Sequence, residues 1–217
     1  MVDGVDYESD ANPGLLILCN VAAADSTYGH IYQLAQKVKA GVDSVPGFEG
    51  VLLQVPEILP EEVLKAMHAP PKPDVPVAKA ADLPQYDGII FGAPTRFGMV
   101  AAQMKAFIDS TGGLWQSGAL VGKPASVFVS TGTQGGGIET TALTFYTQLA
   151  HHGMVIVPTG YSFGERLFGM DEVRAGTAYG ASTYAGPTGA RQPSELELDY
   201  AQHQGSYFAR IAGKLTA

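Results

Sequence analysis

Five short apolar runs constrain the fold of this chain more than any other feature of its sequence. Between most of these runs, apolar residues recur at the spacing of an α-helix, as they do over residues 31–38, 100–108 and 143–150. Runs that are apolar almost throughout are typical of strands buried on both faces, and their alternation with helices predicts a parallel sheet covered on both sides. We therefore expect an α/β fold with right-handed crossover connections. The five predicted strands cover residues 15–20, 51–55, 88–93, 125–130 and 154–157.

The length of 217 residues fits a single domain of this kind. We expect a flexible N-terminal extension over residues 1–14 and one domain over residues 15–217. Gly41 and Gly153 are expected to end two of the helices. Ser194 and Glu197 have the spacing of a capping box, which predicts that the last helix starts there.

Charge and cysteine content exclude several classes of protein. The 13 basic and 21 acidic residues give a net charge of −8, which repels phosphate backbones, so we expect no nucleic-acid partner. No apolar run approaches the roughly 20 residues that cross a bilayer, and the first residues lack the pattern of a signal peptide. Cys19 is the only cysteine, which excludes an internal disulfide and a zinc site made of several cysteines. We expect a cytoplasmic protein with no membrane span and no metal site.

The loop after the first predicted strand carries features of a phosphate site. It reads Ser-Thr-Tyr-Gly-His over residues 26–30 and runs directly into a predicted helix. Hydroxyl groups and the free amides of a helix N-terminus bind phosphate, while the absence of a Gly-x-x-x-x-Gly-Lys-Ser/Thr sequence argues against a nucleoside triphosphate. The same residues are also compatible with an ordinary helix cap.

Two further loops are expected at the same edge of the sheet, because all strand-to-helix loops of a parallel sheet emerge at the carboxyl ends of its strands. Pro-Thr-Arg-Phe-Gly over residues 94–98 offers a planar cation and an aromatic ring. Ser-Thr-Gly-Thr-Gln-Gly-Gly-Gly over residues 130–137 lets the main chain approach a flat ligand, although each loop alone is also typical of an ordinary surface loop. Together the three loops favour a flat mononucleotide such as FMN.

These motifs, with others in the same order, resemble the WrbA-type flavodoxin-like NAD(P)H:quinone oxidoreductases. The further matches are Gly-Gly-Leu-Trp at 112–115, His-His-Gly at 151–153 and Gly-Ala-Arg-Gln-Pro at 189–193, and the resemblance covers about residues 15–216. It implies a flavodoxin-like, doubly wound, five-stranded parallel sheet in the order 2-1-3-4-5, noncovalently bound FMN and a homotetramer. It also implies two-electron reduction of quinones to hydroquinones by NAD(P)H, with ping-pong hydride transfer through flavin N5 and no catalytic residue of the protein itself.

The resemblance also implies which residues form the site. Trp115 is expected to line the quinone pocket, and Tyr28 is expected to lie near the nicotinamide as well as the FMN. His151 is expected to reach the flavin of a neighbouring subunit. The implied FMN-binding residues are Ser26, Thr27, Tyr28, Gly29, His30, Ile31, Pro94, Thr95, Arg96, Phe97, Ser130, Thr131, Gly132, Thr133, Gln134, Gly135 and His151.

One departure from the family pattern keeps two other functions open. Residues 21–25 lie between the first predicted strand and the phosphate loop, where the family has almost no residues. They either lengthen the loop or weaken FMN binding. A flavin-free regulatory or scaffold protein is therefore one alternative, and a one-electron carrier of the flavodoxin type, which shares the fold and the negative charge, is the other.

Overall fold

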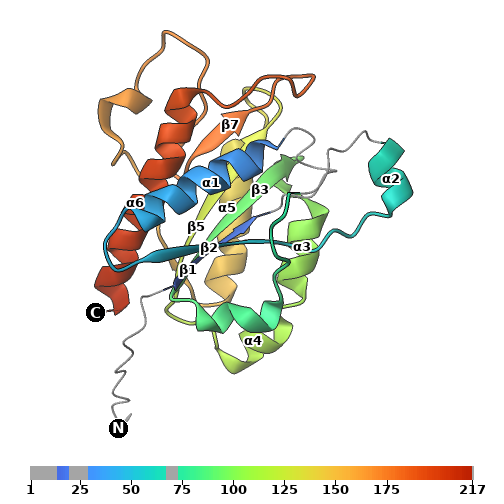
Figure 1. Cartoon of the computed structure of the whole chain (residues 1–217), viewed down its shortest axis with the longest axis vertical. Helices are drawn as coiled ribbons and strands as arrows, with labels where there is room; N and C mark the ends of the chain where they lie inside the picture. Colours follow the sequence, from blue (N-terminus) through green and yellow to red (C-terminus); the bar gives the residue numbers. More distant parts are fainter. Residues whose placement is uncertain (1–13, 20–28, 67–72, 217) are drawn as a thin grey trace.

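The computed structural model describes residues 14–19, 29–66 and 73–216 of the chain (Figure 1). Residues 1–13 of the predicted extension over residues 1–14 lie outside this part of the chain, as do the predicted phosphate-loop residues Ser26, Thr27 and Tyr28. Gly14, the last residue of the expected extension, is the first residue of the first strand.

A parallel sheet forms the centre of the molecule, and its strands follow the predicted order 2-1-3-4-5 when the five predicted strands are counted along the chain. Figure 1 shows this sheet with its strands running toward the end of the molecule where the last helix begins. The strands of the main path are β2 (Glu49–Gln54), β1 (Gly14–Cys19), β3 (Gly88–Arg96), β5 (Pro124–Thr131) and β6 (Val155–Ile156), in this spatial order.

Two short strands were not expected from the sequence. β4 (Met99–Val100) turns back from the end of β3 and pairs with it in antiparallel fashion. β7 (Ser182–Tyr184) runs parallel to the last three residues of β5, whereas β6 pairs with the first two. The position beside β5 is therefore shared by two short strands, and residues 157–181 form an excursion between them.

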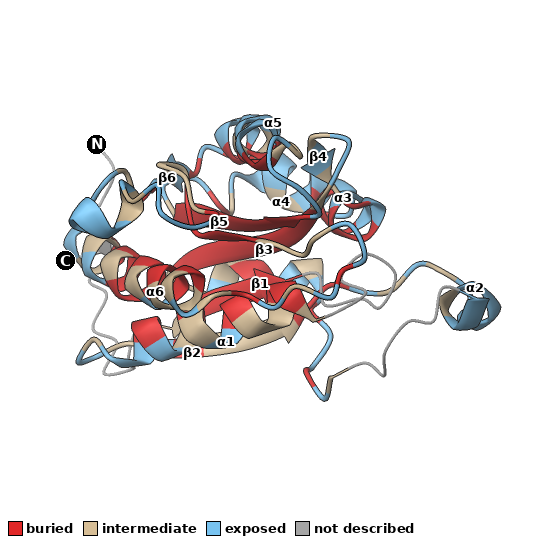
Figure 2. Cartoon of the chain, turned by 90° about the horizontal axis from the view of Figure 1, so that it is seen from above, coloured by how far each residue is buried: buried red, intermediate tan, exposed pale blue. Residues whose placement is uncertain are grey.

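Helices cover both faces of the sheet, as predicted. Figure 2 shows α1 and α6 on one face and α3, α4 and α5 on the other. The helices are α1 (His30–Asp43), α2 (Glu61–Ala66), α3 (Ala102–Asp109), α4 (Gly112–Ser117), α5 (Ile138–His151) and α6 (Glu195–Thr216), with 3-10 turns η1 (Ala80–Gln85) and η2 (Gly164–Leu167).

Strand side chains alternate between two hydrophobic cores, because successive residues of a strand point to opposite faces of its sheet. Leu16 of β1 lies in the core under α3 and α5, while Ile17 lies in the core under α1 and α6. Both side chains have no solvent-accessible surface. Burial on both faces explains why the strands read as continuous apolar runs.

Two of the three predicted helix boundaries are confirmed. Gly153 adopts a positive φ of 69° just after α5, and Ser194 caps α6 by accepting a hydrogen bond from the Glu197 amide at 3.2 Å. The prediction for Gly41 is wrong, because α1 continues through it to Asp43. Gly41 instead allows α1 to approach α6 closely: a Cβ atom there would lie 2.0 Å from the carbonyl oxygen of Gln202.

None of the helices in the described ranges combines the length and the apolar character that crossing a membrane requires.

Candidate functional site

The loops that follow β3 and β5 meet at the carboxyl edge of the sheet. Thr141 donates its hydroxyl proton to the Gly137 carbonyl oxygen at 2.7 Å, so its 2.6 Å hydrogen bond with Thr95 is donated by Thr95. A Cβ atom on Gly137 would lie 2.9 Å from the Cα atom of Gly98, so the two backbones are almost in contact. The second and third predicted loops therefore form one continuous surface.

The described part of the first loop ends at the N-terminus of α1, which lies at this edge. Gly29 is the N-cap of α1 with a φ of 74°, and a Cβ atom there would meet nothing described within 4 Å. The first turn of α1 holds no acidic residue. The first amides of a helix have no carbonyl partner within it, so the amides after Gly29 suit a negatively charged group. His30 and Ile31, which follow Gly29, are both buried.

A fourth segment, residues 185–192, joins the first loop to the third. The ring Nε2 of His30 donates to the carbonyl oxygen of Arg191, and Gln33 Nε2 donates to Gln192 Oε1 at 2.9 Å. On its other side, the Ala185 amide donates to the Thr131 carbonyl oxygen at 2.8 Å. The described parts of all three predicted loops thus share one edge of the sheet.

Phe97 lies in a tighter turn than the sequence suggested. β3 continues through Pro94 to Arg96, so these residues belong to a strand and only Phe97 and Gly98 form the turn into β4. Both turn residues have positive φ angles, 53° and 79°, as a two-residue hairpin with a type I′ turn requires. The ring of Phe97 is fully exposed. A bulky residue with positive φ stores backbone strain, a feature concentrated at functional sites.

The glycine-rich loop lines a hollow beside the N-terminus of α5. The hydroxyl of Thr131 donates to the carbonyl oxygen of Gly136 at 3.0 Å, which holds the loop in a compact shape. Gly135 has a φ of 68°, and no described atom lies within 4 Å of the place where its Cβ atom would be. The hollow has a volume of about 390 Å³ and is bordered by residues 135–140, Gly176, Thr177 and Tyr184.

Predicted site residues at this edge therefore come from three segments of the chain. Ser26, Thr27 and Tyr28 belong to the same loop as Gly29 but are outside the described residues. Those that the structure brings to the edge are Gly29, His30, Ile31, Pro94, Thr95, Arg96, Phe97, Ser130, Thr131, Gly132, Thr133, Gln134 and Gly135.

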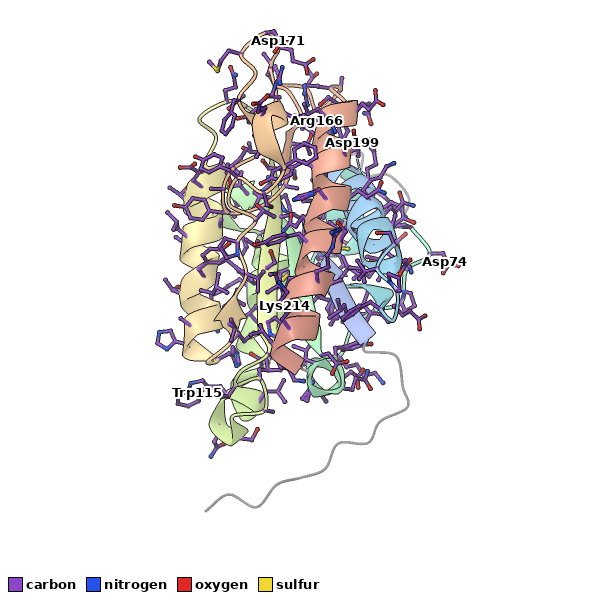
Figure 3. The ribbon with its side chains drawn as sticks, turned by 90° about the vertical axis from the view of Figure 1, so that its left-hand side faces the viewer. Asp74, Trp115, Arg166, Asp171, Asp199 and Lys214 are labelled. Carbon is purple, nitrogen blue, oxygen red and sulfur yellow. The ribbon has the colours of Figure 1, made fainter. Side chains whose placement is uncertain are left out.

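Trp115 and His151 lie at the opposite end of the molecule. α5 has 14 residues and starts at the glycine-rich loop, so its rise of about 1.5 Å per residue carries His151 roughly 20 Å away from that loop. Figure 3 shows Trp115 at the end of the molecule far from Arg166 and Asp199, which lie near the start of α6. Trp115 and His151 line a hollow of about 270 Å³ together with residues of α3.

A buried histidine joins the two elements around this second hollow. The Thr111 hydroxyl donates to the Ile108 carbonyl oxygen at 2.6 Å, so it accepts the hydrogen bond from His152 Nε2 at 2.8 Å. The Nδ1 atom of His152 is buried and has no partner in the described part of the chain. Burial, and secondarily the neighbouring His151, lowers the pKa of His152. The neutral ring thus connects the start of α4 to the end of α5.

The carboxyl-edge site suits a flat, singly phosphorylated ligand. The α1 amides offer neutral donors for a phosphate, the glycine-rich loop borders a hollow of about 390 Å³, and the exposed Phe97 ring lies at the turn between β3 and β4. Within the described ranges, no three histidine, cysteine or acidic side chains gather as they do around a metal ion. A parallel sheet in this strand order with ligand loops at its carboxyl edge defines a flavodoxin-like α/β protein.

Comparison with known proteins identifies the family within this class. Residues 15–166 match the model of the NADPH-dependent FMN reductase family, and the chain belongs to that family. It is 61% identical over 190 residues to the quinone-oxidoreductase QR2 of Triphysaria versicolor, covering 88% of this chain and 93% of the relative. It is 56% identical over 191 residues to the probable NAD(P)H dehydrogenase (quinone) FQR1-like 2 of Arabidopsis thaliana, covering 88% of this chain and 70% of the relative.

Solved structures confirm the flavodoxin-like fold. A flavodoxin described as WrbA-like from Agrobacterium tumefaciens aligns with a TM-score of 0.63 and 20% identity, covering 93% of this chain and 98% of that chain. Oxidised flavodoxin 2 from Bacillus cereus aligns with a TM-score of 0.58 and 18% identity, covering 91% of this chain and 99% of that chain.

Sequence reasoning missed the part that residues 185–192 play in joining the loops. The Gly-Ala-Arg-Gln-Pro sequence at 189–193 was the available signal, but it carries no helix or strand periodicity. Its place at the site depends on hydrogen bonds to residues far away in the sequence, such as His30.

Proposed function

We propose that this chain is an FMN-dependent NAD(P)H:quinone oxidoreductase that reduces quinones to hydroquinones by two electrons. Membership of the FMN reductase family and the names of the two curated relatives support this activity. The observation that carries the proposal is the meeting of three loops at one sheet edge. There α1 begins at Gly29, and no described atom lies within 4 Å of a Cβ atom built on Gly29 or on Gly135 of the glycine-rich loop. When bound, FMN would supply two-electron transfer between NAD(P)H and the quinone.

The protein's own residues bind and orient the cofactor in this proposal. Ser26, Thr27 and the first amides of α1 hold the phosphate, because neutral hydrogen-bond donors at a helix N-terminus stabilise an anion. Residues 94–97 and 130–135 border the flavin ring from two sides. Phe97 and main-chain groups exclude water from one part of the ring, and Arg96 places a positive charge near it.

A second subunit completes the site in this proposal, and the assembly is a homotetramer. Support comes from the separation within one chain between the carboxyl edge and the hollow lined by Trp115 and His151. The indole of Trp115 is 60% exposed in the single chain, and tryptophan is a residue type enriched at protein interfaces. We expect Trp115→Ala to change quinone kinetics while FMN stays bound, and light scattering to report four chains per particle.

A cytoplasmic location is part of the same proposal. Cys19 is the only cysteine and has no accessible surface, so the chain forms no internal disulfide that would require an oxidising compartment. Fluorescence microscopy of the tagged chain in its own cell type tests this location.

Equilibrium titration of the apoprotein with FMN tests the binding part of the proposal. The double substitution Ser26→Ala with Thr27→Ala is expected to weaken FMN binding by about 1–3 kcal/mol, because it removes hydrogen bonds to an ionised group. Ser117→Ala is the matched control, since this exposed serine lies on α4 at the other end of the molecule. Unchanged affinity in the double variant contradicts the phosphate assignment.

Turnover distinguishes the enzyme from its alternatives. We expect the FMN-loaded protein to oxidise NADH or NADPH rapidly when benzoquinone is present. A protein that takes up FMN but passes on only single electrons would be a carrier. A protein that takes up no FMN would be a scaffold or regulator.

A further inference from the structure

A fully buried carboxylate, Glu197, lies at the start of α6 beside the candidate site. It has no accessible surface, yet each of its oxygens accepts hydrogen bonds from several donors. The donors are the amide of Ala175 at 2.9 Å, the hydroxyl of Thr183 at 2.8 Å, the amide of Ser194 at 2.9 Å, and Nη1 and Nη2 of Arg191, both at 2.9 Å.

Arg191 holds this carboxylate with both arms of its guanidinium group. The same group donates to the carbonyl oxygens of Tyr184 at 2.8 Å and Val173 at 3.2 Å. Paired hydrogen bonds between a guanidinium and a carboxylate fix the geometry of both groups, which a lysine ammonium does not do. Arg191 and Glu197 therefore tie residues 173, 184 and 194 to the first turn of α6.

The backbone of Arg191 connects this ion pair to the candidate FMN site. Its carbonyl oxygen accepts the hydrogen bond from His30 at the start of α1. Its amide donates to the carbonyl oxygen of Ala185 at 3.0 Å, and the amide of Ala185 donates to Thr131 at the end of β5. One hydrogen bond thus links Arg191 to His30 at the start of α1, and two link it through Ala185 to Thr131 at the glycine-rich end.

Burying the Glu197 carboxylate is a costly way to gain stability, because its desolvation offsets much of its attraction to Arg191, whose side chain stays 27% exposed. A buried charge held in this way can instead fix one arrangement of the groups around it. Here those groups include the segment 185–192, which spans the gap between α1 and β5.

We propose that Arg191 and Glu197 are positioning residues that hold the N-terminus of α1 and the glycine-rich loop at the separation that FMN binding requires. The inference rests on the proposed function, since it assigns these residues a part in cofactor binding. The inference assigns neither side chain a direct contact with the cofactor. Arg191 acts through its own backbone, and Glu197 acts by fixing Arg191.

Arg191→Lys tests the inference because it keeps the positive charge and removes the two-armed geometry. We expect the FMN dissociation constant of this variant to rise roughly tenfold, the order of effect expected for losing a hydrogen bond to a charged group. The control is Arg166→Lys. Arg166 forms an exposed ion pair at 2.8 Å with Asp199, which lies on α6 two residues after Glu197, so this change alters a similar pair that does not touch residues 185–192.

Four outcomes decide the matter. The inference is supported if Arg191→Lys binds FMN more weakly than wild type and Arg166→Lys does not. If wild type and Arg191→Lys bind FMN with dissociation constants within twofold of each other, the inference is wrong. This holds even if the variant apoprotein unfolds at a lower urea concentration, because a purely structural role predicts lower stability with unchanged FMN affinity. Equal weakening in the Arg166→Lys control also overturns it. Failure of the wild-type apoprotein to take up FMN contradicts the proposed function itself.

Hydrogen exchange on the wild-type protein provides a second test if Arg191→Lys does not fold. FMN binding is expected to slow exchange at the amides of Ala185 and Arg191 at least tenfold, because the bound ligand would fix both ends of the segment that they hold together. The amide of Gly153, which lies at the far end of α5, is the internal control. Unchanged exchange at Ala185 and Arg191 on saturation with FMN overturns the inference.

Discussion

Gly41→Ala is expected to destabilise the protein, although the same change in an exposed helix stabilises. Glycine inside a helix costs about 0.5–1 kcal/mol relative to alanine, so sequence rules alone predict a gain. In this structure the new Cβ atom would lie 2.0 Å from the carbonyl oxygen of Gln202 and 2.9 Å from the amide nitrogen of Ser206. Both are backbone atoms of α6 and have no rotamer that avoids the clash.

The contact is reciprocal, which sets the size of the effect. A Cβ atom on Gly205 of α6 would lie 2.0 Å from the carbonyl oxygen of Val38 on α1. Relief of the Gly41→Ala clash therefore requires the two helices to move apart along the whole contact. Overpacking of this kind costs typically 1–3 kcal/mol, and the upper part of that range less the gain in helix propensity leaves a net loss of about 2 kcal/mol.

Urea unfolding of the apoprotein, followed by circular dichroism, measures this loss. The midpoint of Gly41→Ala should fall while the slope stays unchanged, because the variant exposes the same surface on unfolding. Gly113→Ala in α4 is the control: no described atom lies within 4 Å of its new Cβ, so it should be neutral or stabilising. A Gly41→Ala protein as stable as the control would refute the close approach of α1 and α6.

Three further predictions concern single side chains. Phe97→Gly keeps the positive φ but removes the side chain that makes it cost about 1–2 kcal/mol, so the variant should unfold at no lower urea concentration than wild type. Quinone reduction should slow, and a large loss of stability contradicts the prediction. Burial lowers the pKa of His152 from its ordinary 6.5, so the unfolded ring binds a proton first as pH falls. The free energy of unfolding should therefore decrease below about pH 6.5, and it should decrease less steeply with pH in His152→Gln. Urea titrations at several pH values measure this dependence, and the same dependence in both proteins would show that another group is responsible. Burial also raises the pKa of the Cys19 thiol, so iodoacetamide should label it only after unfolding, as mass spectrometry would reveal.

Local periodicity made most of the fold predictable. Leu15 to Leu18 read as a strand because both faces of β1 are buried, and Leu34 and Val38 read as a helix face because α1 is buried on one side only. Each of these signals depends on residues a few positions apart in the chain. The strand order also follows, once the motifs identify the class of fold.

Contacts between distant segments were not predictable in the same way. Gly41 looked like a helix end because glycine disfavours helices, whereas its real environment is the backbone of α6. Pro94 looked like the start of a loop because proline lacks an amide hydrogen, yet it lies in β3 opposite Ser130 of β5. β7 has only three residues and no alternating pattern, so nothing local distinguishes it from the excursion around it.

The capping residue Glu197 shows how a correct local interpretation can miss function. Its spacing from Ser194 predicts a helix start, and the hydrogen bonds confirm it. Capping requires one carboxylate oxygen near one amide, a role that an exposed glutamate fills equally well. Full burial and the two arms of Arg191 are what give Glu197 its proposed part in cofactor binding, and both depend on the tertiary structure.

The helix α5 holds the two parts of the proposed site at a fixed separation within one chain. Its first residue follows the glycine-rich loop and its last residue is His151, so no bending of a loop brings His151 to the FMN site of its own chain. In the proposed assembly, cofactor binding therefore depends mainly on the loops of one chain, whereas the Trp115 and His151 side of the site comes from a neighbouring chain. Dilution that dissociates the assembly should then lower quinone reduction before FMN is lost, and simultaneous loss of both would show that one chain forms the whole site.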